Sequence, residues 1–237
     1  MDEQGRRMAE IRSNFSKSSG EYDQWIRKVI PRYDEMLDVI INCVRLPEGR
    51  RLRAIDIGCG TGTLSAKLLA SHPAVELTCL DMTEDMLNMA RERLKGHNGV
   101  RYLLHNLYEF EYDGPYDLII SSLALHHMVT DEDKIDQYRR IFQALSSGGS
   151  FFNADVVLAS DERTQELYME KWADFMYHGL PREEVDGSVL PRYHREDSPA
   201  RLTDHLKWMK DAGFSKVDVI WKYYNFTVYG GMKPSAH

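Results

Sequence analysis

The chain has 237 residues, with 30 lysines and arginines against 37 aspartates and glutamates, and a formal net charge of −7. A chain of this size buries roughly three quarters of its unfolded surface and needs no disulfide bonds. Because its three cysteines lack CxxC spacing, we expect reduced thiols in the cytoplasm and no zinc ribbon. The acidic balance disfavours nucleic acid as a partner, and no apolar run predicts a signal peptide or a membrane span.

The first fifty residues have the apolar periodicity of helices. Apolar side chains recur at helical spacing over residues 22–30, stop at Pro31, and resume over residues 33–44. Proline ends or kinks a helix because it lacks a backbone N–H. We therefore predict an N-terminal helical cap over residues 1–48, followed by the main domain over residues 49–237.

Short apolar runs then alternate with amphipathic stretches. The predicted strands cover residues 53–57, 75–80, 100–104, 116–120 and 150–157. The predicted helices begin near Thr63, Thr83 and Thr130, and Thr130 with Asp133 resembles a capping box. Gly148 and Gly149 are expected to turn the chain into the last of these strands. Strands separated by helices predict right-handed crossovers, and hence a doubly wound α/β fold with a mostly parallel sheet.

The alternation ends after this fifth strand. Helices are predicted over residues 163–177 and 201–210, and strands over residues 217–221 and 224–229. Because only about two residues separate the two strands, we expect an antiparallel hairpin. The stretch 180–191 contains Pro181, Gly187 and Pro191, which predicts a loop. Residues 161–197 are predicted to form an inserted lid.

A glycine-rich loop links the first predicted strand of the main domain to the helix that follows. It runs Asp-Ile-Gly-Cys-Gly-Thr-Gly-Thr from Asp56 to Thr63, and glycines allow a ligand to approach the backbone closely. Asp81 ends the next strand, where a carboxylate can accept hydrogen bonds from a ribose diol. The pattern predicts a nucleoside-binding site; a glycine-rich turn without a ligand is the alternative.

Two phosphate-binding motifs match this loop less well. The dinucleotide fingerprint Gly-x-Gly-x-x-Gly requires a third glycine where Thr63 stands, and the Lys and Ser/Thr pair of a P-loop is missing. A nicotinamide-dependent dehydrogenase is therefore a more distant alternative.

The pattern Asp-x-Gly-x-Gly-x-Gly, together with Asp81, resembles the class I S-adenosylmethionine-dependent methyltransferases over nearly the whole chain. The resemblance implies S-adenosylmethionine as the cofactor and a Rossmann-like, doubly wound seven-stranded sheet whose last strand is antiparallel. It also implies that Asp81 binds the ribose, that Met82 flanks the adenine, and that Asn106 accepts from the adenine amine where the family usually has Asp. The cofactor residues implied are Tyr22, Tyr33, Asp56, Gly58, Gly60, Gly62, Asp81, Met82, Asn106, Leu107, Ser121 and Ser122.

Segments near both ends of the chain resemble one branch of this family. That branch contains carboxy-S-adenosylmethionine synthase and related methyltransferases. The segments that carry the resemblance are Tyr22-Asp23, Ile30-Pro31-Arg32-Tyr33 and residues 221–226. The resemblance implies that Tyr33 lies over the cofactor and that an arginine binds an extra carboxylate. Arg192 and Arg195 are the candidates for this substrate contact.

Three titratable residues follow strands at the edge where ligands bind in open α/β sheets. His126 and His127 follow one strand and Asp155 ends another, so they are candidate catalytic residues and proton acceptors. For His127, a structural role as a hydrogen-bonded residue at a helix start is the alternative. Some relatives with Glu-x-x-Glu-His here coordinate a divalent ion, but Leu123 replaces the first carboxylate, so no metal is expected.

Aromatic residues in the predicted lid helix, Tyr168 and Trp172 among them, can steady a sulfonium or a cationic acceptor through cation–π contacts. Packing against the core is the alternative for each of them.

The leading hypothesis is an S-adenosylmethionine-dependent methyltransferase that acts on a small molecule. One alternative is an enzyme for which S-adenosylmethionine is itself the substrate, either carboxylated or cleaved within its aminobutyrate arm. Another is a cofactor-binding protein without catalysis. The expected partner is a small-molecule substrate, and we expect binding to neither a membrane nor a nucleic acid. Formation of a homodimer is a further possibility.

Overall fold

Seven strands form a single sheet in the part of the chain that the computed structural model describes, residues 22–45 and 51–235. They are β1 (Arg53–Ile57), β2 (Glu76–Asp81), β3 (Val100–Leu104), β4 (Tyr116–Ser122), β5 (Leu145–Val156), β6 (Ser215–Tyr223) and β7 (Phe226–Met232). Their order is β3-β2-β1-β4-β5-β7-β6, and only β7 is antiparallel to its neighbours. The sheet confirms the predicted Rossmann-like α/β fold.

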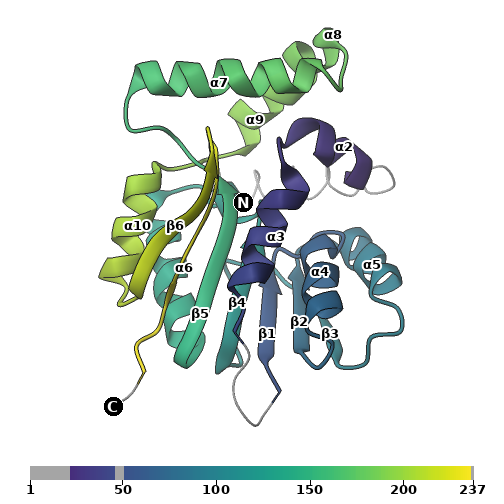
Figure 1. Cartoon of the computed structure of the whole chain (residues 1–237), viewed down its shortest axis with the longest axis vertical. Helices are drawn as coiled ribbons and strands as arrows, with labels where there is room; N and C mark the ends of the chain where they lie inside the picture. Colours follow the sequence, from purple (N-terminus) through teal and green to yellow (C-terminus); the bar gives the residue numbers. More distant parts are fainter. Residues whose placement is uncertain (1–21, 46–50, 236–237) are drawn as a thin grey trace.

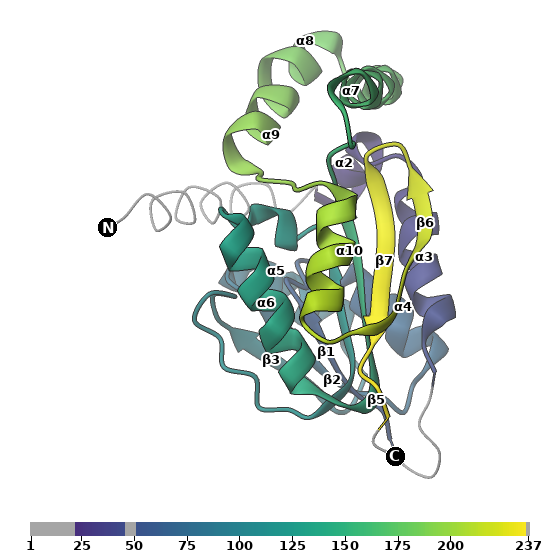
Figure 2. The ribbon, with the colours of Figure 1, turned by 90° about the vertical axis from the view of Figure 1, so that its left-hand side faces the viewer.

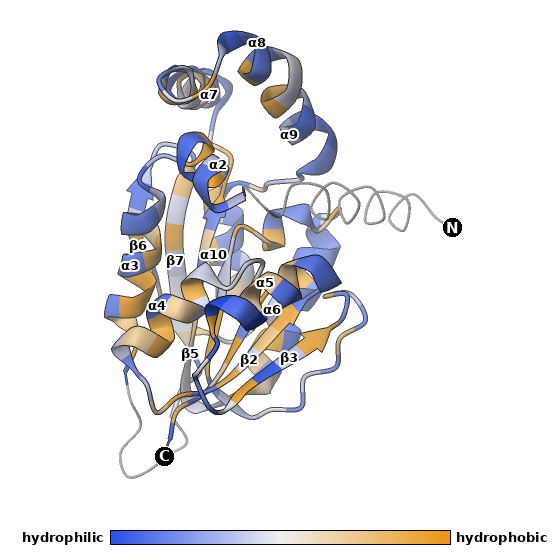
Figure 3. Ribbon diagram, turned by 90° about the vertical axis from the view of Figure 1, so that its right-hand side faces the viewer, coloured by the Kyte–Doolittle hydropathy of each residue, from blue (hydrophilic) through white to orange (hydrophobic). Residues whose placement is uncertain are grey.

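Helices cover both faces of the sheet. One face carries α3 (Tyr33–Cys43), α4 (Thr63–Ser71) and α5 (Glu84–Arg93), and the other carries α6 (Asp131–Ala144) and α10 (Leu202–Asp211) (Figures 1 and 2). Successive strand residues point to opposite faces, so Phe152 and Val228 join the core under α3, while Phe151 and Tyr229 join the core under α6 and α10. Figure 3 shows the hydrophobic residues concentrated in the strands between these layers.

Several local predictions are confirmed by hydrogen bonds. The hydroxyl of Thr130 accepts from the Asp133 N–H at 3.1 Å, and the Asp133 carboxylate accepts from the Thr130 N–H at 3.0 Å, which completes the capping box of α6. Residues 224–225 form the short turn of the β6–β7 hairpin. Thr83 precedes α5 as predicted, but its hydroxyl donates to Asp81 and does not cap the helix.

The predicted start of the fifth strand is wrong. Gly148 and Gly149 lie within β5, which begins at Leu145, and the register against β4 shifts between the pairs formed by Tyr116 and Leu118. A Cβ atom on Gly149 would stand 3.0 Å from the Tyr116 carbonyl oxygen. The glycines therefore allow a bulge in close contact with β4, and they do not end the strand.

Residues 182–191 of the stretch 180–191 are helical, which corrects the predicted loop. It contains α8 (Arg182–Glu184), the π-helical turn η3 (Val185–Val189) and the start of α9 (Leu190–Glu196). Pro181 precedes the first helical residue, and Pro191 lies in the first turn of α9. At such positions a helix tolerates proline because the missing N–H has no essential partner.

Two segments lie beyond one end of the sheet in Figure 1: α2 (Tyr22–Val29), and the chain from α7 (Glu162–Tyr177) to α9. The Trp172 indole N–H donates to the Val29 carbonyl at 2.7 Å and joins α7 to α2. At the base of the predicted lid 161–197, Leu158 N–H donates to the Ala200 carbonyl at 2.9 Å.

The described helices of the predicted cap, residues 1–48, have different neighbours. Residues 1–21 lie outside the described part of the chain. Of the described helices, α3 packs on α4, β5 and β7 as part of the sandwich, whereas α2 contacts the lid helix α7. No helix in the described ranges is both long and apolar enough to cross a membrane.

Candidate active site

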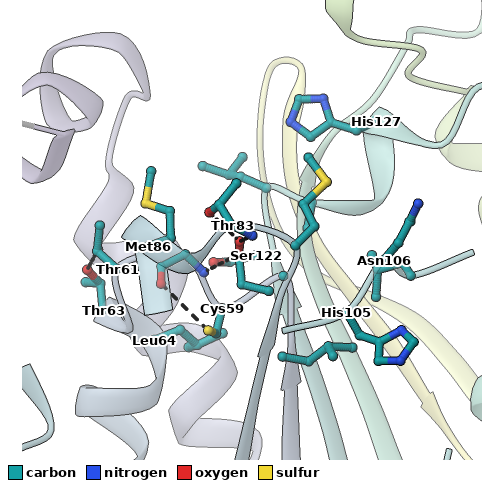
Figure 4. Close-up of a pocket in the computed structure, with 18 of the residues that line it drawn as sticks. Cys59, Thr61, Thr63, Leu64, Thr83, Met86, His105, Asn106, Ser122 and His127 are labelled. Atoms are coloured by element: carbon teal, nitrogen blue, oxygen red, sulfur yellow. Dashed lines mark hydrogen bonds between the residues drawn. The ribbon is translucent and has the colours of Figure 1, made fainter. Parts of the chain in front are cut away.

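The first cavity opens where β1, β2, β3 and β4 end, and it encloses about 900 Å³, including space open to solvent. Figure 4 shows Thr61 and Thr63 at one side of it, Asn106 and His105 at the other, and Ser122 and Thr83 between them. Of the predicted cofactor residues, nine line this cavity: Tyr22, Tyr33, Gly58, Gly60, Asp81, Met82, Asn106, Leu107 and Ser122. Its size is in the range of small-molecule sites.

The glycine loop has a conformation and a packing that require glycine. Gly58 has φ +70°, and a Cβ atom there would stand 2.4 Å from the Ala124 side chain in the loop after β4. Gly62 has φ +78° and would bring a Cβ atom 3.1 Å from Ala90 of α5. Both residues adopt the left-handed region that L side chains rarely enter. The loop can therefore pass close to a ligand between β1 and α4.

Asp81 stands at the end of β2 and organises the loop across the cavity. Its Oδ2 accepts from the Gly60 N–H at 2.9 Å, and its Oδ1 accepts from the Thr83 N–H at 2.9 Å and from the Thr83 hydroxyl at 2.8 Å. Burial raises the pKa of Asp81, although the hydrogen bonds from Thr83 and Gly60 oppose this effect. Carboxylate oxygens have more than one lone pair, so Asp81 can also accept from a ligand diol.

Asn106 follows β3 on the opposite side of the cavity. Its side-chain oxygen accepts from the Tyr108 N–H at 3.1 Å. An amide oxygen has two lone pairs, so this bond leaves one acceptor position for the predicted contact with an exocyclic amine.

Three predicted cofactor residues lie outside the lining. Asp56 is buried and accepts from the Ser65 hydroxyl at 2.7 Å, and burial raises the pKa of Asp56 to about 7. Ser121 is also buried and donates to the Ile57 carbonyl at 2.9 Å. Gly62 packs against α5. These residues support the walls of the cavity from behind.

A polar cluster that the sequence did not predict closes one side of the cavity. Asp23 of α2 accepts from the Thr61 hydroxyl at 2.7 Å and pairs with Arg93 of α5. Burial opposes ionisation of Asp23, but the hydrogen bonds from Arg93 and Thr61 lower its pKa. Thr61 and Thr63 also line the cavity; their place in the glycine loop was the available signal. The cluster joins the cap helix to the glycine loop.

A second cavity of about 610 Å³ lies between α2, the lid and the sheet. Its wall is mostly apolar, and its aromatic members include Trp25, Trp172, Tyr193 and Phe226. Tyr22, Leu123 and His127 line both cavities. The two spaces are therefore neighbours that share one wall.

The polar end of the second cavity is lined by two histidines and one carboxylate, with a second carboxylate behind them. Nδ1 of His126 is 2.5 Å from Oδ1 of Asp155, which is buried behind the lining. Oδ1 of Asp197 is 3.6 Å from Nε2 of His126 and 3.2 Å from Nδ1 of His127. Asp197 ends the lid and was missed, because no sequence pattern relates it to the histidines.

The charge states of this group depend on each other. Burial opposes protonation of His126, but the carboxylates of Asp155 and Asp197 outweigh it and raise the pKa of His126. Burial likewise opposes ionisation of both carboxyl groups, but His126 lowers the pKa of Asp155 and that of Asp197. The carboxylates of Asp155 and Asp197 therefore favour their ionised state beside His126.

Of the predicted lid and substrate residues, two line the second cavity and two do not. Trp172 lines the second cavity and is buried, and its indole is tied to α2. Tyr168 accepts from the Lys222 ammonium at 2.8 Å and is absent from both linings. Arg192 lines the second cavity, 5.7 Å from the Trp25 ring, and its guanidinium lies 3.1 Å from Glu196. Arg195 also pairs with Glu196, at 3.2 Å, and lines neither cavity.

Comparisons with known proteins place this geometry in context. A family model described as a methyltransferase domain matches residues 54–149. An uncharacterised methyltransferase of Staphylococcus carnosus is 29% identical over 160 residues, which is 65% of this chain and 71% of that protein. A carboxy-S-adenosyl-L-methionine synthase of Nautilia profundicola is 18% identical over 221 residues, which is 90% of each protein.

Solved structures share the fold. The S-adenosylmethionine-dependent methyltransferase SibL, in its apo form, matches with a TM-score of 0.62 and 21% identity over 85% of this chain. The match covers 55% of SibL, so the present chain spans little more than half of that structure. At this level of identity the match shows a common fold.

Proposed function

We propose that this chain, which belongs to the class I S-adenosylmethionine-dependent methyltransferases, is a small-molecule methyltransferase. The methyl group passes from S-adenosylmethionine in the first cavity to a small molecule in the second. The observation that carries the proposal is the shared wall of Tyr22, Leu123 and His127. A sulfonium in one cavity and a nucleophile in the other can meet at this wall in line for displacement.

In this proposal the first cavity binds the cofactor through the loops at the ends of the strands. Asp81 accepts from the ribose hydroxyls, Met82 and Leu107 flank the adenine, and Asn106 accepts from its amine. The glycine loop supports the ribose and the methionine part. These roles are supported by the position of each residue on the lining.

Methyl transfer from a sulfonium needs positioning, exclusion of water and a suitable electrostatic environment. An acceptor that must lose a proton also needs a base. Because an ionised carboxylate can only accept, Asp155 keeps the proton of His126 on Nδ1 and leaves the lone pair on Nε2. We assign proton acceptance to Nε2 of His126 and a positioning role to Asp155, while the rings of Trp172 and Tyr193 enclose the acceptor.

The test is an incubation of the purified protein with S-adenosylmethionine and panels of phenols, amines, thiols and carboxylic acids, with products identified by mass spectrometry. We expect S-adenosylhomocysteine to form only when a suitable acceptor is present. His126→Gln should reduce turnover with a hydroxyl acceptor by about 10²–10⁴-fold, the usual contribution of general base catalysis. His178→Gln, on the outer part of the lid, is the matched control. Consumption of the cofactor without any acceptor would contradict the proposal.

A second candidate function is supported by the match to carboxy-S-adenosyl-L-methionine synthases over nine tenths of the chain. In that case S-adenosylmethionine is itself the substrate, and Arg192 on the second cavity contacts the added carboxylate. The same incubation separates the two candidates, because it would yield a carboxylated cofactor, or methylthioadenosine if the aminobutyrate arm is displaced. Tight cofactor binding with no product in any arm would favour a non-catalytic role.

We further propose a small-molecule acceptor and a cytoplasmic location. The cavity dimensions support the first, and the absence of disulfides among Cys43, Cys59 and Cys79 supports the second. Self-association stays a prediction, and size-exclusion chromatography with light scattering tests it.

A further inference from the structure

Three potential metal ligands from two distant parts of the chain converge at the polar end of the second cavity. His126 and His127 belong to the short helix η2 (Leu125–His127) after β4, and Asp197 follows α9. One nitrogen from each histidine and one Asp197 oxygen all lie within 4.8 Å of one another. The Ser198 N–H donates to the His126 carbonyl at 2.8 Å and holds the end of the lid against η2.

The distances from Asp197 Oδ1 to the two histidine nitrogens match the distances between ligands around one ion. Zinc binds imidazole nitrogen and carboxylate oxygen at about 2.0–2.2 Å, so neighbouring ligand atoms of a tetrahedral site are roughly 3.4 Å apart. Asp197 Oδ1 lies 3.6 Å from His126 Nε2 and 3.2 Å from His127 Nδ1. All three residues line the second cavity, which gives an ion a route of entry.

His126 also has the outer partner that metal-binding histidines usually have. Such histidines donate their second N–H to a carboxylate or a carbonyl, which fixes the tautomer and the ring orientation. Asp155 takes this place at 2.5 Å from Nδ1. Asp155 in turn accepts from the Asn153 amide at 3.1 Å and from the Val156 N–H at 3.0 Å. The lone pair of Nε2 is therefore held toward Asp197.

We propose that His126, His127 and Asp197 bind one divalent transition-metal ion of the zinc and cobalt class. Two imidazoles and one carboxylate suit these ions better than magnesium or calcium, which prefer all-oxygen ligands. Three protein ligands with an open position are the arrangement of catalytic zinc sites. The sequence led us to expect no metal because Leu123 lacks a carboxylate, but Asp197 of the lid supplies one from another part of the fold.

The role of the ion rests on the proposed function, whereas its binding does not. An acceptor oxygen bound at the open position would be held beside the wall shared with the cofactor cavity, and the ion would lower the pKa of that hydroxyl. Nε2 of His126 is then a ligand and no longer the proton acceptor, and the hydroxyl, with its pKa lowered by the ion, would release its proton to solvent water.

The experiment uses the full chain without an affinity tag, stripped with a chelator and titrated with Co²⁺ and Zn²⁺ at pH 7.5. Calorimetry measures the stoichiometry, and the visible spectrum of Co²⁺ reports the coordination geometry. We expect one ion per chain. Asp155→Asn should weaken binding by about 10–100-fold, the usual effect of removing an outer partner, and Asp197→Asn and His127→Asn should weaken it further. His178→Gln, on the same lid, should bind as the wild type does.

S-adenosylhomocysteine affinity, measured on each sample, reports folding independently of the metal. A wild type that binds S-adenosylhomocysteine but no stoichiometric Co²⁺ overturns the metal site and leaves the proposed function standing. Binding of Co²⁺ that persists unchanged in both Asp197→Asn and His127→Asn also overturns it. If one variant loses S-adenosylhomocysteine binding through misfolding, the other decides. Stoichiometric Co²⁺ binding together with cofactor turnover in the absence of an acceptor supports the metal site and contradicts the proposed function.

Discussion

Gly58 has no space for a side chain, because its Cβ would lie only 2.4 Å from the Ala124 methyl carbon. The backbone also adopts φ +70°, which costs a residue with a side chain about 1–2 kcal/mol. Gly58→Ala should therefore reduce the free energy of unfolding by more than 2 kcal/mol, as measured by urea denaturation. Gly187→Ala in η3 is the control, because nothing lies within 4 Å of its added Cβ and its φ is not positive. Equal stability of the two variants would contradict this account of the loop.

His205 of α10 is buried in the core, and its titration makes the free energy of unfolding depend on pH. It is 2% exposed and lies 2.7 Å from the Tyr138 hydroxyl, and burial lowers the pKa of His205 to about 4. Since the ordinary pKa is about 6.5, the unfolded chain binds this proton more readily than the folded one between pH 6.5 and 4. The contribution to stability is complete above pH 6.5 and is lost as the pH falls toward 4, by at most about 3 kcal/mol.

Replacing His205 with glutamine should remove this dependence, because glutamine does not titrate in that range. Urea denaturation at pH 7.5 and pH 4.5 measures it: the wild type should lose more stability between the two pH values than His205→Gln does. His97→Gln is the control, because His97 is exposed to water in the folded chain. An equal loss in the wild type and His205→Gln would show that other groups dominate the acid response.

At the scale of residues, the sequence predicts the side chains that belong to a continuous motif. Asp81 and Gly58 could be placed because a strand–loop–helix pattern fixes where each lies. Asp23 and Asp197 could not be, because each reaches the site from a segment whose position depends on tertiary packing. Tyr168 shows the converse: helical spacing placed it on an aromatic face, but Lys222 and Tyr224 hold it away from both cavities.

At the scale of elements, the cap helix α2 is held over the first cavity by Asp23, which bonds to Thr61 and pairs with Arg93. Hydrogen bonds to charged groups contribute about 1.5–3 kcal/mol, and 1.4 kcal/mol corresponds to a tenfold change in affinity. Asp23→Ala should therefore weaken S-adenosylhomocysteine binding about tenfold, because Tyr22 beside it lines the cavity. Calorimetry measures the affinity.

The control for α2 is Asp34→Asn. Asp34 of α3 pairs with Arg27 of α2 at 2.8 Å, but both side chains are more than 40% exposed. Exposed pairs contribute little, so this variant should change the affinity less than twofold. Similar losses in Asp23→Ala and Asp34→Asn would indicate that the position of α2, and not the bonds to the glycine loop, determines cofactor binding.

Elements with a strong pattern of their own were predicted well, and those defined by packing were not. The capping box fixed the start of α6, and the alternating strands fixed most of the sheet. The chain from α8 to α9 contains prolines and a glycine that normally mark loops, yet Val185 and Val189 are buried in the core that also contains Trp172 and Met176 of α7, which keeps it helical. Local composition cannot report such tertiary burial.

At the scale of the whole molecule, the two cavities couple parts that are distant in sequence. The first cavity is lined by α2, α3 and the ends of four strands, and α2 is tied to the lid through Trp172. Because α3 is part of the core sandwich, a ligand in this cavity should stabilise the folded chain as one unit. The sequence predicted the sheet and the cofactor loop, but this connection between cap, lid and core depends on contacts that only the fold reveals.

Linkage gives this coupling a magnitude. A ligand that binds only the folded chain adds about 2.7 kcal/mol at a concentration of 100 times its dissociation constant, which raises the melting temperature of a chain of this size by roughly 5–10 °C. We expect this shift, in a single calorimetric transition, with S-adenosylhomocysteine, and none with NAD at the same concentration, because the loop lacks the third glycine of a dinucleotide site. A shift with NAD alone would favour a dehydrogenase. Two transitions, of which only one moves, would show that the cap and the lid unfold separately from the sheet.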